Sequence, residues 1–240
     1  MSSKSLFPFD SVLNLRRQRP PLASDAVHLW LVDLDALGPI ASALSANLSS
    51  DERETAHRLV SNVLRRRYLL AHGVVRYVLS AYLEVPPAEI RLIRSPTGKP
   101  SLDQHVHERI FFNLSHCQGA ALIAVTEAGD VGVDIEQRRP IPEMLEIARD
   151  HFGPMEHQQI RATPADCRDA LFFQLWTRKE ALVKLAGAGL GAPLQALPDC
   201  STLSFRPSPG FFAAAAVRHP KATWVMLPDP GGEDGARLRG

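Results

Sequence analysis

The chain contains few cysteines and no arrangement that would pair them. Cys117, Cys167 and Cys200 are far apart, are odd in number, and form no Cys-x-x-Cys pair with a histidine at metal-ligand spacing. This pattern excludes a disulfide framework and a cysteine-based zinc site. It is typical of reduced thiols, so a cytoplasmic location is expected.

The sequence also has a formal net charge of only +1 and no long apolar runs. Its 27 Lys and Arg residues stand against 26 Asp and Glu residues, which leaves no bulk field to favour nucleic acid or anionic lipid. No segment has the length of a membrane span, and residues 1–21 have no apolar core followed by a cleavage site. Neither export nor membrane insertion is expected, and any anion site must be local.

The first half of the chain reads as one strand, a long helical stretch and a pair of strands. Residues 26–37 are apolar or alternating, which predicts a strand. Residues 49–85 carry a capping serine, early acidic residues and apolar residues at helical spacing, with Gly73 as the expected break between two helices. Further strands are expected at 109–117 and 119–127.

The second half begins with a strand and continues with helices. The strand at 131–137 follows a Gly-Asp turn and is expected to complete an antiparallel meander with the two strands before it. Helices are expected between residue 140 and about 186, and short strands near 201–206, 211–217 and 222–227. The chain is therefore expected to be an α+β protein, with a disordered Gly-rich tail after about residue 228.

Two carboxylates lie two residues apart on a predicted strand. Because strand side chains alternate, Asp134 and Glu136 project from the same face. Two negative charges at such a short distance repel each other unless a cation binds between them. Magnesium is a suitable cation, because it prefers carboxylate oxygens supplemented by water and phosphate. Taken alone, however, such a pair more often faces solvent on an edge strand.

A second charged pair lies on the last predicted helix. Glu180 and Lys184 are four residues apart and share a helix face. An ordinary surface ion pair would look the same. The leucines and valines around the pair make this helix apolar over much of its circumference, so a cleft-facing position is expected.

Several polar groups stand at a turn and at a strand end, where they could meet a phosphate. Gly98 allows close backbone approach in the turn that carries Lys99, a point charge for a phosphate. Ser115 and His116 could both donate to an anion, or they could belong to a polar cluster that ties strand ends together. Asn113, on the same strand face as Ser115, is expected to be structural. No G-x-S-x-G elbow surrounds Ser115, so a hydrolase nucleophile is not supported.

Four sequence blocks, taken in order, resemble the signature of the 4'-phosphopantetheinyl transferases, and most closely the two-domain surfactin-synthetase-activating type. The blocks are GKP (98–100), FNLSHC (112–117), GVDIE (132–136) and WTRKEALVK (176–184). Each is ordinary alone, but four in this order and spacing are highly specific. The resemblance implies two similar α+β halves with pseudo-two-fold symmetry, residues 1–127 and 128–240, each a small antiparallel sheet packed with helices. Because the chain would hold both halves of the coenzyme A cleft, a monomer is expected.

The resemblance also implies the reaction and its residues. In this family the 4'-phosphopantetheine arm of coenzyme A moves to a serine of an acyl or peptidyl carrier protein, and adenosine 3',5'-bisphosphate is released. Fatty acid, polyketide and non-ribosomal peptide synthases supply such carriers, and secondary metabolism is the expected setting. The implied magnesium ligands are Asp134, Glu136 and Glu180, with Asp134, Glu180 and Lys184 as the catalytic residues. The implied coenzyme A contacts are Lys99, Ser115, His116, Lys184 and, less directly, Arg67. Whether Glu180 is a general base, a metal ligand or both is left open.

Two other functions are compatible with these residues. A metal-dependent phosphohydrolase could use the same carboxylates on another nucleotide, and it would release phosphate from coenzyme A without a carrier. A coenzyme A- and carrier-binding protein without catalysis is the second alternative. The intact acidic set argues against it, because binding alone does not need Glu180.

Overall fold

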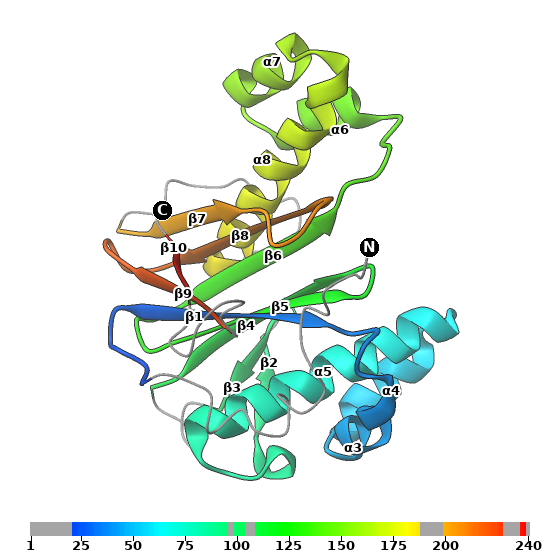
Figure 1. Ribbon diagram of the computed structural model, residues 1–240, viewed down its shortest axis with the longest axis vertical. Coiled ribbons are helices and arrows are strands. Elements are labelled where there is room, and N and C mark those ends of the chain that lie inside the picture. The colour runs from blue at the N-terminus through cyan, green and yellow to red at the C-terminus, as the bar shows by residue number, and fades with distance from the viewer. Residues whose placement is uncertain (1–20, 96–97, 104–108, 188–198, 228–235, 239–240) are drawn as a thin grey trace.

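The computed structural model describes residues 21–95, 98–103, 109–187, 199–227 and 236–238 (Figure 1). The elements of its first half are β1 (Ala26–Asp33), η1 (Gly38–Ile40), α3 (Ala41–Ala46), α4 (Ser50–Arg58), α5 (Asn62–Leu83), η2 (Pro87–Glu89), β2 (Leu92–Arg94), β3 (Pro100–Leu102), β4 (Phe111–Cys117) and β5 (Ala120–Thr126). Those of the second half are β6 (Val131–Gln137), α6 (Met144–His151), α7 (Pro154–Ala162), α8 (Ala165–Ala186), β7 (Ser201–Phe205), β8 (Phe211–Val217), β9 (Thr223–Leu227) and β10 (Ala236–Leu238). The expected α+β class is confirmed.

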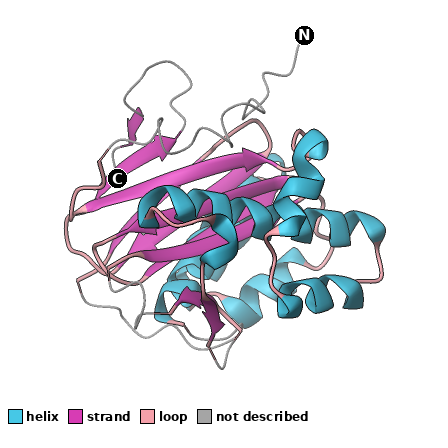
Figure 2. Cartoon of the chain, turned by 90° about the horizontal axis from the view of Figure 1, so that it is seen from below, coloured by secondary structure: helices cyan, strands magenta, loops and turns pink. Residues whose placement is uncertain are grey.

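The strands form two main sheets that lie face to face between two long helices. The five-stranded sheet has the order β10-β9-β1-β5-β4, the three-stranded sheet has the order β6-β8-β7, and β2 and β3 make a separate hairpin. Most neighbouring strands are antiparallel, while β1 and β9 are parallel. Figure 1 shows α5 against the larger sheet and α8 against the smaller one, with α6 and α7 beyond the start of α8. Seen from below, helices lie across the strands (Figure 2).

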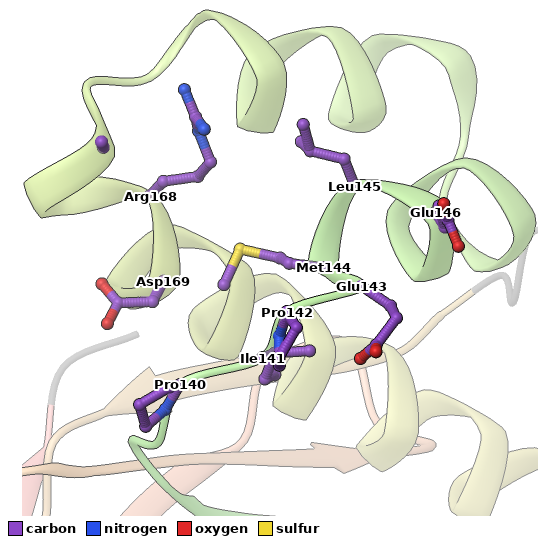
Figure 3. A pocket seen from close by; sticks show the side chains of 10 residues that line it. Pro140, Ile141, Pro142, Glu143, Met144, Leu145, Glu146, Arg168 and Asp169 are labelled. Atoms are coloured by element: carbon purple, nitrogen blue, oxygen red, sulfur yellow. The ribbon is translucent and has the colours of Figure 1, made fainter.

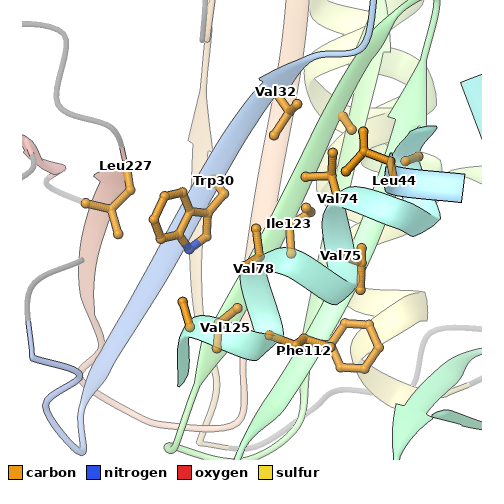
Figure 4. Packing of buried hydrophobic residues seen from close by; sticks show 14 of the residues in the cluster. Trp30, Val32, Leu44, Val74, Val75, Val78, Phe112, Ile123, Val125 and Leu227 are labelled. Atoms are coloured by element: carbon orange, nitrogen blue, oxygen red, sulfur yellow. The ribbon is translucent and has the colours of Figure 1, made fainter. Parts of the chain in front are cut away.

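The side chains of a strand point alternately to its two faces, and the central strands are apolar on both faces because each face is buried in a core. From β1, Trp30 and Val32 point into the core formed with α5, while Leu29 and Leu31 point into the core between the two sheets. Figure 4 shows the first of these cores, where valines of α5 meet side chains of β1 and β5. Burial of both sets stabilises the layered arrangement, at roughly 1.5–3 kcal/mol for each large side chain.

The expected antiparallel meander is wrong. After β4 and β5 pair with each other, β6 leaves their sheet and pairs with β8 in the second sheet. The alternating pattern of 131–137 identifies a strand correctly. It cannot specify which partner strand lies beside it, since residues far along the chain provide β8.

The expected helix break at Gly73 is also wrong. The chain leaves the helical conformation at Leu59, and α5 then runs unbroken from Asn62 to Leu83, with the Ser61 side chain accepting a hydrogen bond from the amide of Leu64. Gly73 has a packing role instead: a Cβ atom there would lie 2.7 Å from the Cβ of Leu44 on α3. The glycine therefore allows two helices to approach closely.

The C-terminal strands tie the two halves of the chain together. Although β9 and β10 follow residue 128, they complete the sheet of the first half, with β9 beside β1. Residues Ala236–Leu238 pair with β9, so this part of the tail is ordered, contrary to expectation. Residues 228–235 and 239–240 lie outside the described part. Within the described ranges, no helix has the length and apolar character needed to cross a bilayer.

Candidate functional site

The site lies where an edge strand of each sheet meets the other. β4 and β6 are neighbours in space, but they belong to different sheets and share no backbone ladder. Side chains take the place of that ladder: the amide of Val133 donates to Oδ1 of Asn113 (2.9 Å), and the carbonyl of Val131 accepts from Nζ of Lys99 (3.1 Å). Buried backbone groups need such partners. The predicted structural role of Asn113 is confirmed by its bond across the gap.

Three predicted site residues form one hydrogen-bonded cluster beside this gap. The hydroxyl of Ser115 donates to Oδ1 of Asp134 (2.9 Å). Nζ of Lys184 donates to the same carboxylate oxygen (2.7 Å) and to Oγ of Ser115 (2.9 Å). Ser115 and Asp134 are buried, whereas the Lys184 side chain is 29% exposed, so the cluster opens toward solvent on the lysine side.

A glycine makes the approach of the third element possible. Helix α8 packs so closely on β6 that a Cβ atom at Gly132 would lie 2.1 Å from the carbonyl oxygen of Ala181 and 2.4 Å from the amide of Leu185. Real Cβ atoms do not come that near to backbone, so a larger residue would push the helix away. The contact brings the Lys184 end of α8 over the strand that carries Asp134.

The carboxylates of Asp134 and Glu180 have the surroundings of cation ligands. Oδ2 of Asp134 is buried and, among the described residues, has no hydrogen-bond partner. Glu180 is also buried, at 8% exposure. Burial raises the pKa of Glu180 and the charge of Asp134 raises it further, against a smaller opposing effect of Lys184. A cation between the two carboxylates would satisfy the orphaned oxygen and relieve their repulsion.

The third predicted metal ligand is turned toward another partner. Glu136 is partly exposed and pairs with Arg139, whose guanidinium lies 2.7 Å from the carboxylate and also stacks over the ring of Phe173. Across the residues that the structure describes, no three Asp, Glu, His or Cys side chains are gathered into a ready metal cluster. The structure thus brings Asp134 and Glu180 within electrostatic reach of each other but leaves Glu136 at the rim.

Lys99 and His116 flank the cluster in different ways. Lys99 is half-buried, and its Nζ also donates to the carbonyl of Lys184 (2.7 Å). Burial lowers the pKa of Lys99, an effect that Asp130 opposes and Lys184 strengthens. Desolvation, followed by the electrostatic effects of His72 and Lys184, lowers the pKa of His116 to about 4. The His116 side chain nevertheless reaches the surface, so at pH 7 it is a neutral, accessible imidazole.

The three arginines at the start of α5 have separate surroundings. Arg65 donates to backbone carbonyls at the end of α4, and Arg66 is exposed, with no hydrogen bond or ion pair among the described residues. Arg67 pairs with Asp35 at 3.0 Å and lies against Gly119 in the turn after His116. This placement makes Arg67 the arginine of the triplet that borders the site.

Two charged neighbours of the site were missed by the sequence reasoning. Arg139 stands three residues after Glu136, a spacing at which an ion pair could have been anticipated from the letters alone. Asp35 is far from Arg67 in the sequence, and only the return of α5 beneath β1 brings the pair together. No local pattern signals that contact.

A surface pocket lies just beyond the rim. It has a volume of about 460 Å³ and is formed by the segment from Pro140 to Glu146 and by Arg168 and Asp169 near the start of α8 (Figure 3). None of the predicted coenzyme A contacts lines it. The polar cluster, to which β4 contributes Ser115, and this pocket in the second half are therefore separate features.

The comparison with known proteins decides the family. A model described as the N-terminal part of 4'-phosphopantetheinyl transferases matches residues 39–128, and one for the 4'-phosphopantetheinyl transferase superfamily matches residues 130–226. The 4'-phosphopantetheinyl transferase HetI of Nostoc sp. is 36% identical over 217 residues, which cover 83% of this chain and 92% of HetI. The chain belongs to the 4'-phosphopantetheinyl transferase family. The resemblance found in the four sequence blocks is confirmed.

Other members of the family are similar over most of their length. The 4'-phosphopantetheinyl transferase Sfp of Bacillus subtilis is 30% identical over 195 residues, covering 72% of this chain and 83% of Sfp. A putative 4'-phosphopantetheinyl transferase of Synechocystis sp. is 32% identical over 173 residues, which cover 72% of this chain and 70% of that protein. As a phosphopantetheinyl transferase of this two-part type, the protein is a transferase enzyme.

Proposed function

We propose that the protein transfers the 4'-phosphopantetheine arm of coenzyme A to a serine of an acyl or peptidyl carrier protein. The observation that supports this most directly is the cluster of Ser115, Asp134 and Lys184. It joins three segments that are far apart in the sequence, beside the buried carboxylate of Glu180. A polar cluster of this kind, in a member of this family, is suited to a pyrophosphate and a divalent cation.

A magnesium ion is part of the proposal. Asp134 and Glu180 would hold it, with Glu136 joining them from the rim once it leaves Arg139. The orphaned oxygen of Asp134 and the raised pKa of Glu180 support this choice. When bound, the ion would supply positive charge to the pyrophosphate of coenzyme A.

Basic and hydroxyl groups on the other side of Asp134 are proposed to bind the phosphates of coenzyme A. Lys184 presents a partly exposed ammonium, and Ser115, at the end of β4, would donate its hydroxyl to a phosphate once that hydroxyl leaves Asp134. The neutral imidazole of His116 can donate one hydrogen bond, and Arg67 adds a guanidinium beside the following turn. Together these groups would orient the pyrophosphate, because each donates from a fixed element of the fold.

The proposed chemistry is the attack of the carrier serine oxygen on the β-phosphorus of coenzyme A. A new oxygen–phosphorus bond forms, and the bond to the bridging oxygen of adenosine 3',5'-bisphosphate breaks. Glu180, beside the metal position, accepts the serine proton directly or through a water molecule. Lys184 stabilises the negative charge that moves onto the leaving phosphate.

The finer features of the function belong to the same proposal. We expect a cytoplasmic monomer that acts on carriers of polyketide, non-ribosomal peptide or fatty acid synthases, with secondary metabolism as the main setting. We also propose that the chain divides into halves at residues 127 and 128, near the boundary between its two family matches. The strands β9 and β10 then cross from the second half to the sheet of the first.

Intact mass spectrometry tests the proposal. The protein is mixed with coenzyme A, magnesium and either an apo acyl carrier protein or an apo peptidyl carrier domain. The expected result is the gain of one phosphopantetheine group on the carrier, abolished by a chelator and restored by excess magnesium. Phosphate release from coenzyme A without a carrier would instead indicate a phosphohydrolase. Binding of coenzyme A without any mass gain on either carrier would indicate a binding protein.

A further inference from the structure

Lys99 reaches across the gap between the two halves of the molecule. It lies immediately before β3, and its Nζ donates to the carbonyl of Val131 at the start of β6 (3.1 Å) and to the carbonyl of Lys184 in the last turn of α8 (2.7 Å). Two of the three ammonium donors are thus used by backbone of the second half. This geometry differs from that of a lysine held open for a phosphate.

Both carbonyls are groups that regular secondary structure leaves in need of a partner. α8 ends at Ala186, and the last four carbonyls of a helix have no intrahelical donor. Among the described residues, the carbonyl of Lys184 otherwise receives a longer bond, from the amide of Gly187 (3.3 Å). The carbonyl of Val131 lies on the edge of β6 that faces away from β8, the same edge on which Asn113 meets Val133. A lysine charge at a helix C-terminus is also favourable.

The two bonds act where the helix and the strand already touch. Val131 precedes Gly132, whose missing side chain lets the backbone of Ala181 and Leu185 approach β6. From this point the side chain of Lys184 extends to Asp134 and Ser115. The position of the Lys184 backbone therefore decides whether its ammonium reaches the carboxylate.

We propose that Lys99 is a positioning residue that clamps the last turn of α8 to the start of β6 and so fixes Lys184 against Asp134 and Ser115. This inference rests on the proposed function for its kinetic consequences. It assigns to Lys99 an action through Lys184 in place of a direct contact with coenzyme A.

Steady-state kinetics separate the two roles. For Lys99→Met, which keeps the length of the side chain and removes its donors, kcat is expected to fall about 10- to 100-fold while KM for coenzyme A stays within about twofold. Lys99→Arg, which keeps the charge and the donors, should recover at least part of the loss. Lys221→Met, at an exposed lysine near β9, is the matched control and should behave like the parent protein. A rise of about tenfold in KM with an unchanged kcat would overturn the proposal.

A double-mutant cycle sharpens the test. If Lys99 acts through Lys184, adding Lys99→Met to Lys184→Met should cost less than about twofold further in kcat/KM. Two independent contacts with coenzyme A would instead give losses that multiply. Multiplying losses would contradict the clamp.

Hydrogen exchange in the absence of substrate provides a readout that does not depend on turnover. In Lys99→Met, amides of a peptide covering residues 181–187 should exchange several-fold faster, while those of α5 should not change. Unchanged exchange at 181–187 would refute the clamp even in an active enzyme. Faster exchange in a protein that modifies no carrier would leave the clamp standing and overturn the proposed function alone.

Discussion

Nζ of Lys184 lies 2.7 Å from Oδ1 of Asp134, which places the end of α8 directly over the middle of β6. The ion pair uses one oxygen of the aspartate and leaves the other, Oδ2, buried and without a partner among the described residues. Most buried polar atoms have at least one hydrogen-bond partner. The unsatisfied Oδ2 therefore supports the proposed cation position on that side of the carboxylate.

Asp134→Asn should abolish most transfer while leaving the fold intact. The amide keeps the shape of the side chain but loses the negative charge, so we expect a fall in kcat of about 100-fold or more. Carrier modification measured by intact mass gives the rate, and circular dichroism reports the fold. Glu143→Gln, at an exposed carboxylate in the second half, is the control and should retain activity. Near-normal turnover in Asp134→Asn would remove Asp134 from the site.

Gly132→Ala should lower both stability and activity. Its Cβ would meet the backbone of Ala181 at 2.1 Å, and backbone cannot yield as a flexible side chain does. We expect a loss of roughly 1–3 kcal/mol in the free energy of unfolding, measured with urea, and a lower kcat because α8 moves away from Asp134.

Gly38→Ala is the matched control for that steric effect. Its Cβ would meet only the guanidinium end of Arg66, which can rotate away. This variant should therefore stay within about 0.5 kcal/mol of the parent protein. An equal loss of stability in both variants would show that close helix–strand approach at Gly132 is not the cause.

The sequence predicted the elements of this fold better than their partners. Alternation and helical spacing located β4, β5, β6 and α8, because those patterns are local consequences of burial on one or two faces. The paired residues of β6 and β8, and those of β9 and β1, are 74 or more positions apart in the sequence. Local patterns carry no information about such contacts, which is why the expected meander was wrong.

In the candidate site, too, the sequence predicted the residues better than their contacts. The family blocks indicated Ser115, Asp134 and Lys184, and the structure brings these three together. The sequence did not indicate that Lys99 would bind backbone carbonyls, since a turn lysine looks the same whether it is solvated, binds phosphate or caps a helix. The glycine in GVDIE could be read only as a small residue until α8 was seen against it.

Arg67→Gln should weaken the affinity for coenzyme A. Arg67 borders the turn after His116, whereas the guanidinium of its exposed neighbour Arg66 lies against Gly38. Loss of a charge-assisted hydrogen bond to a phosphate is expected to raise KM for coenzyme A about tenfold with little change in kcat. Arg66→Gln removes the same charge one position away and should leave KM unchanged. Equal effects of the two substitutions would point to general electrostatic attraction in place of a specific contact.

Acid stability should depend on the buried cluster around Glu52 in α4. Its carboxylate pairs with Arg76 (2.8 Å) and with His72 (3.2 Å) of α5, and it also accepts from the amide of Ser49. Burial alone would raise the pKa of Glu52, but the bond to His72, the bond to Ser49 and the charge of Arg76 together lower it from 4.5 to about 2.

A carboxylate whose pKa is lower in the folded protein contributes stability above its unfolded pKa and loses it as the pH falls toward the folded one. For Glu52 the contribution is about 3 kcal/mol at neutral pH, and it should disappear progressively between about pH 5 and pH 2. Urea unfolding at a series of pH values should therefore show a steep fall in this window. In Glu52→Gln the fall should be shallower and the stability at pH 7 lower. Glu54→Gln, which removes an exposed carboxylate of the same helix, should follow the parent curve. Parallel curves for the parent and Glu52→Gln would show that Glu52 does not control acid unfolding.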